Sequence, residues 1–387
     1  MGDFLVGADA RPLHVDLGDM VAYLAGFDDN RPATAIADEL MVRTIAISAP
    51  GEEPVVLSVC DLIGLTRVHE DKGRRVVACT HTHHAPDTIG FWGQPMEGVS
   101  GRVPAFDELV RSTVTASQDA ALSAMEPASI RAGSASVAGL VANLRNPDVV
   151  DDEVSVLVAD DLEGQRIATL VSFGCHPEVV APDNTEITAD YAGYTCRELE
   201  LRHGGVAALV VGALGGMQSP STDIHTHAEA ARFGVALADA VTALQLNSVG
   251  DGVRFARTDI VVRLINPIYQ LGAEMGLVPQ PETRDDGVVT EVSMIRIGDV
   301  ALACLPGELL PELGLQLKAD LRAGGVRVPA IVGLADDEVG YILPKEDFVE
   351  PADYLDPGKQ YEESLSIGPD IGPAVMAAVR ALDLATR

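Results

Sequence analysis

Three histidines stand close together in the segment THTHH at positions 80–84, directly after the apolar run Val76–Ala78. In an extended chain, side chains two positions apart point to the same face, so His81 and His83 can approach one metal ion while His84 points away. Imidazole is a common zinc ligand and titrates near neutral pH, which suits metal binding and proton transfer. The spacing predicts a metal site, although a lone histidine is more often structural.

Two further polar residues follow apolar runs. His176 comes after the run ending at Phe173 and before Pro177, which favours extended backbone at His176. Glu308 follows Leu305 through a Pro-Gly pair. Because α/β folds place their sites at strand ends, both are candidates to join the histidines. For Glu308 the alternative is an ordinary carboxylate at the start of a helix.

The elements that must position these residues are short buried strands and amphipathic helices. Strands are predicted at Met41–Ser48, Val55–Val59, Val76–Ala78, Val154–Val158, Ala168–Phe173, Ala207–Val211, Val300–Leu305 and Val328–Val332. Helices are predicted at Phe106–Met125, Ala189–His203, His227–Leu244 and Leu309–Ala323. The irregular alternation, with further β structure at Arg254–Leu264, predicts an α/β fold with a mixed sheet and flanking helices.

Domain organisation follows from what separates these elements. No repeat or Pro/Gly-rich linker divides the chain, so we expect a single large domain over residues 1–387. The segment 336–373 is rich in Asp, Pro, Gly and Tyr and is interpreted as a long loop that closes over the active site.

Charge and composition exclude several classes of function. The chain has 27 Lys and Arg against 58 Asp and Glu, a net charge of −31, which disfavours nucleic acid and anionic membranes as partners. It has no membrane-spanning run and no visible secretory signal, and its five cysteines form no Cys-x-x-Cys pair. We expect a cytoplasmic protein that binds a small molecule, with homo-oligomers left open.

The motifs above, in their order along the chain, resemble the catalytic domain of the neutral ceramidases, a family of zinc amidases. The resemblance spans most of the chain and is carried by VGADARPLH, SVCDLIGL with Asp61, THTHHAP, NLRNP with Arg145, CHP with His176, TADY, PGE with Glu308, GYILP with Tyr341, and Tyr361-Glu362. It implies a mixed α/β catalytic domain.

The resemblance also implies roles for individual residues. Zinc would be bound by His81, His176, Glu308 and the Tyr341 hydroxyl. His83 would lie beside the zinc-bound water as the general base, and Arg145 and Tyr361 would face the substrate carbonyl. This chemistry is reasonable, because zinc with an open position lowers the pKa of bound water to about 7 and a guanidinium can stabilise the developing oxyanion.

Two segments leave alternatives open. Where the family has a Gly-Asp-Val-Ser-Pro segment, this chain has GGMQSP at 215–220, so Ser219 is a candidate for substrate contact, or the segment is only a tight strand-to-helix turn. The second His-x-His, His225 and His227, could form its own metal pair. The favoured interpretation is a helix start capped by Asp223 or Thr226, with the histidines at the rim of the active site.

The combined prediction is a zinc-dependent hydrolase that cleaves a linear amide, with a small soluble substrate rather than ceramide. One alternative keeps zinc as a Lewis acid for a cyclase, lyase or esterase reaction. Another is a binding protein with a structural metal site, which His83 and Arg145 disfavour because a closed four-ligand site needs neither.

Overall fold

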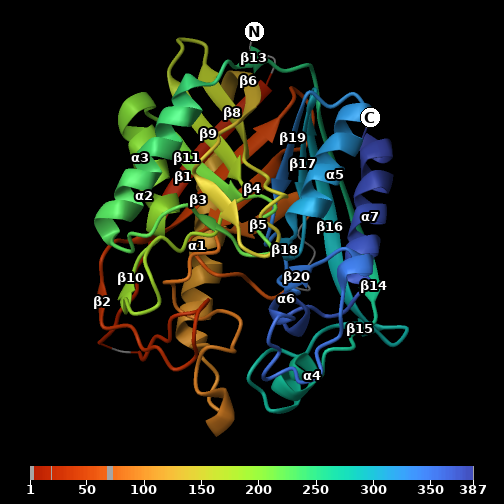
Figure 1. Ribbon diagram of the computed structural model, residues 1–387. Helices are drawn as coiled ribbons and strands as arrows, with labels where there is room; N and C mark the ends of the chain where they lie inside the picture. Colours follow the sequence, from red (N-terminus) through yellow and green to blue (C-terminus); the bar gives the residue numbers. More distant parts are fainter. Residues whose placement is uncertain (1–3, 19, 68–72, 387) are drawn as a thin grey trace.

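The computed structural model describes residues 4–18, 20–67 and 73–386, and the larger of its two main sheets lies at the centre of the fold (Figure 1). Its order is β11-β9-β8-β6-β1-β3-β4-β5, with β13 paired to β6. Most neighbours are antiparallel, but β4–β5 and β9–β11 are parallel pairs. The strands are β1 Phe4–Leu13, β3 Leu40–Ser48, β4 Val55–Cys60, β5 Arg75–Cys79, β6 Glu126–Ser136, β8 Glu153–Asp161, β9 Arg166–Phe173, β11 Val206–Val211 and β13 Asn247–Ser248.

The second main sheet has the order β14-β16-β17-β19, with β15 paired to β16. Here β17 and β19 are the parallel pair. The strands are β14 Val253–Val262, β15 Thr283–Arg284, β16 Gly287–Ile297, β17 Val300–Cys304 and β19 Val328–Val332.

The two sheets pack face to face, and helices cover both outer faces, so the fold has four layers (Figure 1). Helices α1 (Pro104–Ser123), α2 (Asp190–His203) and α3 (His227–Ala243) pack on the first sheet. Helices α5 (Pro311–Ala323) and α7 (Ile371–Thr386) pack on the second.

Strand β8 shows why the buried strands have continuous apolar runs. Val154, Val156 and Val158 face the helix layer, whereas Leu157 and Ala159 face the second sheet. Successive side chains of a strand point to opposite faces, so a sheet covered on both sides needs apolar residues at both sets of positions.

Shorter elements connect these layers and surround the candidate site. Three pairs of short strands are β2 (Ala35–Ile36) with β10 (Glu186–Ile187), β7 (Val141–Asn143) with β12 (Gln218–Pro220), and β18 (Glu308–Leu309) with β20 (Tyr341–Ile342). The remaining elements are η1 (Pro95–Glu97), α4 (Pro267–Glu274), η2 (Lys345–Asp347) and α6 (Tyr361–Ser364).

The prediction of a mixed α/β fold with flanking helices is confirmed, and the ends of every predicted strand and helix lie within three residues of those of an observed one. The segment 336–373 is mostly irregular, but it contains β20, η2 and α6 and ends inside α7, and its closing over the active site stays a prediction. Within the described residues, no helix is long and apolar enough to span a membrane.

Candidate metal centre

The candidate site lies where parallel strands of both sheets end. His81 follows β5 and His176 follows β9, both in the first sheet, while Glu308 follows β17 in the second. Tyr341 comes after β19, and the parallel pairing of β18 with β20 sets it directly beside Glu308. Strands β5 and β9 are not neighbours in the first sheet, so tertiary packing, and not strand pairing, brings His81 and His176 together.

His81 and His176 are buried and anchored in the same way. The Nδ1–H of His81 donates to the carbonyl oxygen of Ile63 at 2.6 Å, and the Nδ1–H of His176 donates to that of Gln218 at 3.1 Å. A neutral imidazole protonated at Nδ1 has a lone pair at Nε2. Both rings are therefore arranged as metal-binding histidines usually are, with the second nitrogen fixed by a backbone carbonyl.

Glu308 faces both of these Nε2 atoms. Its Oε2 atom lies 3.1 Å from Nε2 of His176 and 3.5 Å from Nε2 of His81. Two lone pairs and a carboxylate oxygen cannot face one another in a buried space without a proton or a cation between them. The donor set, two imidazoles and a carboxylate, is one that zinc accepts, so these residues fit the metal.

The pKa values of Glu308 and His176 also favour a cation in the centre. Burial acts to raise the pKa of Glu308, but His81 and His176 outweigh it and lower the pKa to about 2. Burial acts to lower the pKa of His176, but Glu308 and Glu178 outweigh it and raise the pKa to about 9. The centre therefore stabilises a positive charge beside Glu308.

His83 is the third histidine of the buried group. The nearest ring nitrogens of His81, His83 and His176 all lie within 4.8 Å of one another, and this is the group of the described residues with the geometry to hold an ion. Unlike the other two, His83 makes no hydrogen bond through either ring nitrogen. Burial, then the neighbouring His81 and His176, lower its pKa well below the usual value, so its ring is neutral at neutral pH.

Tyr341 lies close to Glu308, but its hydroxyl is bonded elsewhere. It donates to the sulfur of Met217 at 3.6 Å, and its ring lies 6.1 Å from the ring of Tyr361. Burial, followed by the charge of Glu308, raises the pKa of Tyr341 well above its usual value. The structure thus places Tyr341 beside the centre without a hydrogen bond to any histidine of the group.

Arg145 forms hydrogen bonds with two glutamates, neither of which was predicted from the sequence as its partner. Its Nη1 donates to Glu362 at 2.6 Å, and its Nη2 donates to Glu363 at 2.8 Å. The hydrogen bond to Glu363 is the largest cause of the raised pKa of Arg145. Tyr361 begins the short helix α6 that carries both glutamates, so Arg145 and Tyr361 are joined through one element.

Ser219 and Glu178 form a contact that sequence reasoning missed. The Ser219 hydroxyl donates to Oε1 of Glu178, and Oε2 of Glu178 lies 3.6 Å from Nδ1 of His83. Glu178 stands two residues after His176 in the sequence, and that spacing in the His-Pro-Glu segment was the available signal. Gln218, which precedes Ser219, also contributes to the site, because its carbonyl oxygen anchors His176.

Similarity to known proteins is found in the three-dimensional structure. No family model and no curated protein matches the chain in sequence. Among solved structures, neutral ceramidase from Pseudomonas aeruginosa matches with a TM-score of 0.79 and 17% identity over 100% of this chain and 74% of that chain. A ceramidase complexed with C2 matches with a TM-score of 0.78 and 17% identity over 100% of this chain and 75% of that one. The chain has the neutral ceramidase fold.

Within the neutral ceramidase fold, the second His-x-His pair does not join the metal centre. His225 donates through Nδ1 to the carbonyl oxygen of Val179 at 3.0 Å. His227 is the first residue of α3, and its Nε2 lies 3.0 Å from the carboxylate of Glu186. Thr226 caps the helix by accepting a hydrogen bond from the Glu229 N–H, which is the favoured sequence interpretation.

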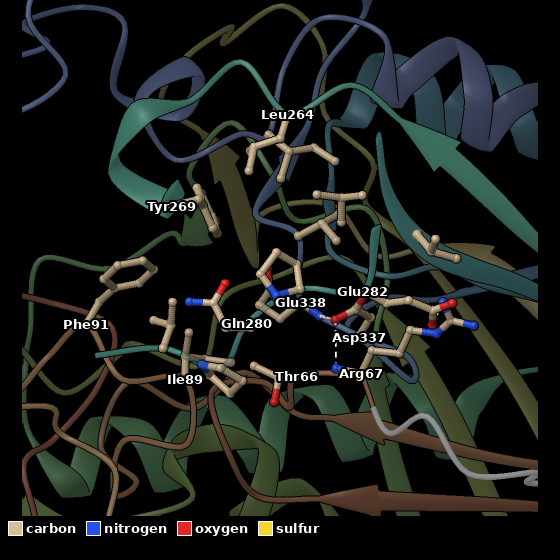
Figure 2. Close-up of a pocket in the computed structure, with 17 residues that line it drawn as sticks. Thr66, Arg67, Ile89, Phe91, Leu264, Tyr269, Gln280, Glu282, Asp337 and Glu338 are labelled. Carbon is tan, nitrogen blue, oxygen red and sulfur yellow. Dashed lines mark hydrogen bonds and ion pairs between the residues drawn. The ribbon is translucent and has the colours of Figure 1, made fainter. Parts of the chain in front are cut away.

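Glu338 lines a pocket that contains none of the residues of the centre (Figure 2). In Figure 2, Phe91, Ile89 and Gln280 lie on one side of Glu338, with Arg67 and Glu282 on the other. Glu338 accepts a hydrogen bond from the Gly340 N–H through Oε1, while its buried Oε2 has no partner. Burial, then Glu308, raise the pKa of Glu338 well above its usual value, so the pocket is electrostatically linked to the centre.

Proposed function

We propose that this protein is a zinc-dependent hydrolase of linear amide bonds. The observation that carries the proposal is the pair of imidazoles, His81 and His176, whose Nε2 atoms both face one carboxylate oxygen of Glu308 while their Nδ1 atoms are fixed on backbone carbonyls. The neutral ceramidase fold supports it, because the matched structures are ceramidases, which cleave an amide.

The proposed ligands are His81, His176 and Glu308, with Tyr341 as the fourth. A set of three histidines is the alternative, because His83 lies in the same buried group. Two differences favour the first set. His83 lacks the carbonyl anchor of the other histidines, and its Nδ1 faces the carboxylate of Glu178 instead. Tyr341, which pairs with Glu308 in the short β18–β20 ladder, would complete the set by turning its hydroxyl away from Met217.

Zinc with an open coordination position would activate a water and polarise the amide carbonyl. His83, neutral at neutral pH, accepts the proton of the attacking water and passes it to the leaving nitrogen. Arg145 has five N–H donors, and Glu362 and Glu363 hold the guanidinium through only part of them. We assign the remaining donors, together with the Tyr361 hydroxyl, to the substrate oxygen on which charge develops.

For the substrate we propose a small, polar, uncharged or cationic amide. Glu362 and Glu363 both pair with Arg145, so these three side chains together carry a net negative charge, which disfavours an anionic group beside them. The pocket beside Glu338 has apolar and aromatic walls, including Phe91 and Tyr269, and we assign it to a compact substrate body. The net charge of −31 disfavours extraction of a lipid from an anionic membrane.

The test is turnover by purified protein with the metal removed and then restored. The panel contains small neutral amides, N-acyl amino acids, esters and short- and long-chain ceramides at equal concentration. We expect the cleavage of neutral amides to stop when the metal is removed and to return when zinc is restored. Zinc-dependent cleavage of esters alone would favour the esterase alternative, and faster cleavage of long-chain ceramide than of every soluble amide would refute the substrate proposal.

A further inference from the structure

The ring of His83 is held in place by its neighbours but lacks hydrogen bonds. It meets the ring of Phe27 edge-on at 4.7 Å between centroids, and the rings of His81 and His176 at 5.0 and 5.5 Å. On another side the backbone of Gly26 is so close that a Cβ atom there would lie 2.4 Å from the ring. Packing restricts where the ring can go, but packing alone does not determine which nitrogen carries the proton.

The carboxylate that faces this ring is itself oriented by a serine. Glu178 is 9% exposed in its side chain and has Oε2 at 3.6 Å from Nδ1 of His83. Its other oxygen accepts a hydrogen bond from the Ser219 hydroxyl. Ser219 also lies within 3.2 Å of the Met217 carbonyl oxygen, so its hydroxyl is surrounded by acceptors. This hydrogen bond fixes one oxygen of Glu178, so the other oxygen is directed toward His83.

We propose that Glu178 is a positioning residue for His83 and that Ser219 orients Glu178. In this arrangement Glu178 holds the proton of His83 on Nδ1, which leaves the Nε2 lone pair available in the metal centre. No covalent bond forms at Ser219. The proposal rests on the proposed function for its effect on turnover, but the arrangement of Ser219, Glu178 and His83 can be tested without turnover.

The same arrangement serves either role of His83. As a general base, His83 must present an unprotonated Nε2 to the attacking water, and a carboxylate at Nδ1 both selects that tautomer and stabilises the imidazolium that forms. As a metal ligand, His83 would need the same Nε2 lone pair, again with Nδ1 held by a carboxylate. Glu178 is therefore required in both cases, whereas a free Ser219 is required in neither.

The experiment follows the histidine tautomers by nitrogen NMR in the zinc-loaded protein. The ring signals of His83 are assigned by their loss in His83→Gln. We expect wild-type His83 to be neutral with its proton on Nδ1, and Glu178→Gln to shift it toward the other tautomer. Ser219→Ala should give a smaller shift in the same direction. An unchanged His83 signal in Glu178→Gln would overturn the proposal.

Activity and metal content provide the second readout. We expect Glu178→Gln to lower kcat by about 10- to 100-fold, a typical effect of losing the partner of a functional histidine, with zinc content and KM nearly unchanged. Ser219→Ala should lower kcat less than Glu178→Gln does. Loss of all activity in Ser219→Ala with an unchanged His83 tautomer would identify Ser219 as a nucleophile and contradict the proposal.

A matched control exists elsewhere in the chain. Glu186 pairs with His227 at 3.0 Å, which is also a glutamate–histidine contact but lies outside the centre. Glu186→Gln should change the His227 signals while leaving the His83 tautomer and kcat as they are. If Glu186→Gln lowered kcat as much as Glu178→Gln, the effect would not be specific to His83, and the proposal would fail.

Discussion

Two His-x-His pairs in this chain share a local pattern but lie in different surroundings. His81 and His83 are 4% and 5% exposed and lie with His176 in the buried centre. His225 and His227 lie at the start of α3 and bond to a carbonyl and to a partly exposed glutamate. Spacing alone therefore does not define a metal site. What separates the pairs is whether other strand ends bring further donors to the same place.

The largest expected difference between the pairs is in metal binding. His81→Ala removes one of the two anchored imidazoles that face Glu308, so we expect zinc content near zero and activity at background. Elemental analysis of protein purified without chelator checks this. Full zinc occupancy in His81→Ala would mean that His83 replaces it or that the ligand set is wrong.

Within the first pair, the two histidines should differ. His83→Ala should keep most of the zinc but lower the hydrolysis rate by about 100- to 10,000-fold, the usual contribution of a general base. The measurement is kcat and zinc content side by side with His81→Ala. Equal loss of metal in both variants would contradict the division between ligand and base and favour a three-histidine site.

His84, the neighbour of the first pair, should affect stability more than activity. Burial, then Arg31, lower its pKa to about 3 in the folded chain, against about 6.5 when unfolded. Below pH 6.5 the unfolded chain binds a proton that the folded chain does not, so stability should fall as pH decreases from about 6.5 toward 3. Thermal unfolding at several pH values should show a weaker pH dependence in His84→Gln. The exposed His14, changed to Gln, is the control.

The smallest effects are expected in the second pair. His225→Ala and His227→Ala should leave zinc content unchanged and kcat within about twofold, because neither side chain belongs to the buried group. Rate and metal assays are the check. A large loss of zinc in either variant would show that the second pair binds metal as well, and would remove the contrast between the two regions.

The sequence predicted the buried strands well, because a sheet covered on both faces requires unbroken apolar runs such as β8. It predicted less about β1 and β6, whose Gly, Pro, Asp and Ser residues obscure the pattern. The predicted location in the cytoplasm, the single domain over residues 1–387 and the partners stay predictions.

The extended geometry predicted for His81 and His83 was wrong, although both residues do lie in the buried centre. β5 ends at Cys79, so His81 and His83 lie in a loop and not in strand geometry. His81 has φ of 63°, in the left-handed region that is uncommon for a residue other than glycine. Such a backbone is fixed by tertiary contacts, here the hydrogen bond from the ring to Ile63, and no local pattern reveals it. Glu178 stands close to His176 in the sequence, but its role was missed because its partners Ser219 and His83 come from other segments.

The residues of the centre follow strands of both main sheets: His81 and His176 follow strands of the first, while Glu308 and Tyr341 lie in the short β18–β20 pair that follows strands of the second. An ion held by all of them would join segments far apart in sequence across the boundary between the two sheets. The site is complete only after the sheets have packed in the correct alignment. A partly folded chain with unpacked sheets would therefore bind the ion poorly, and metal uptake would come late in folding, as a step that selects correctly assembled molecules.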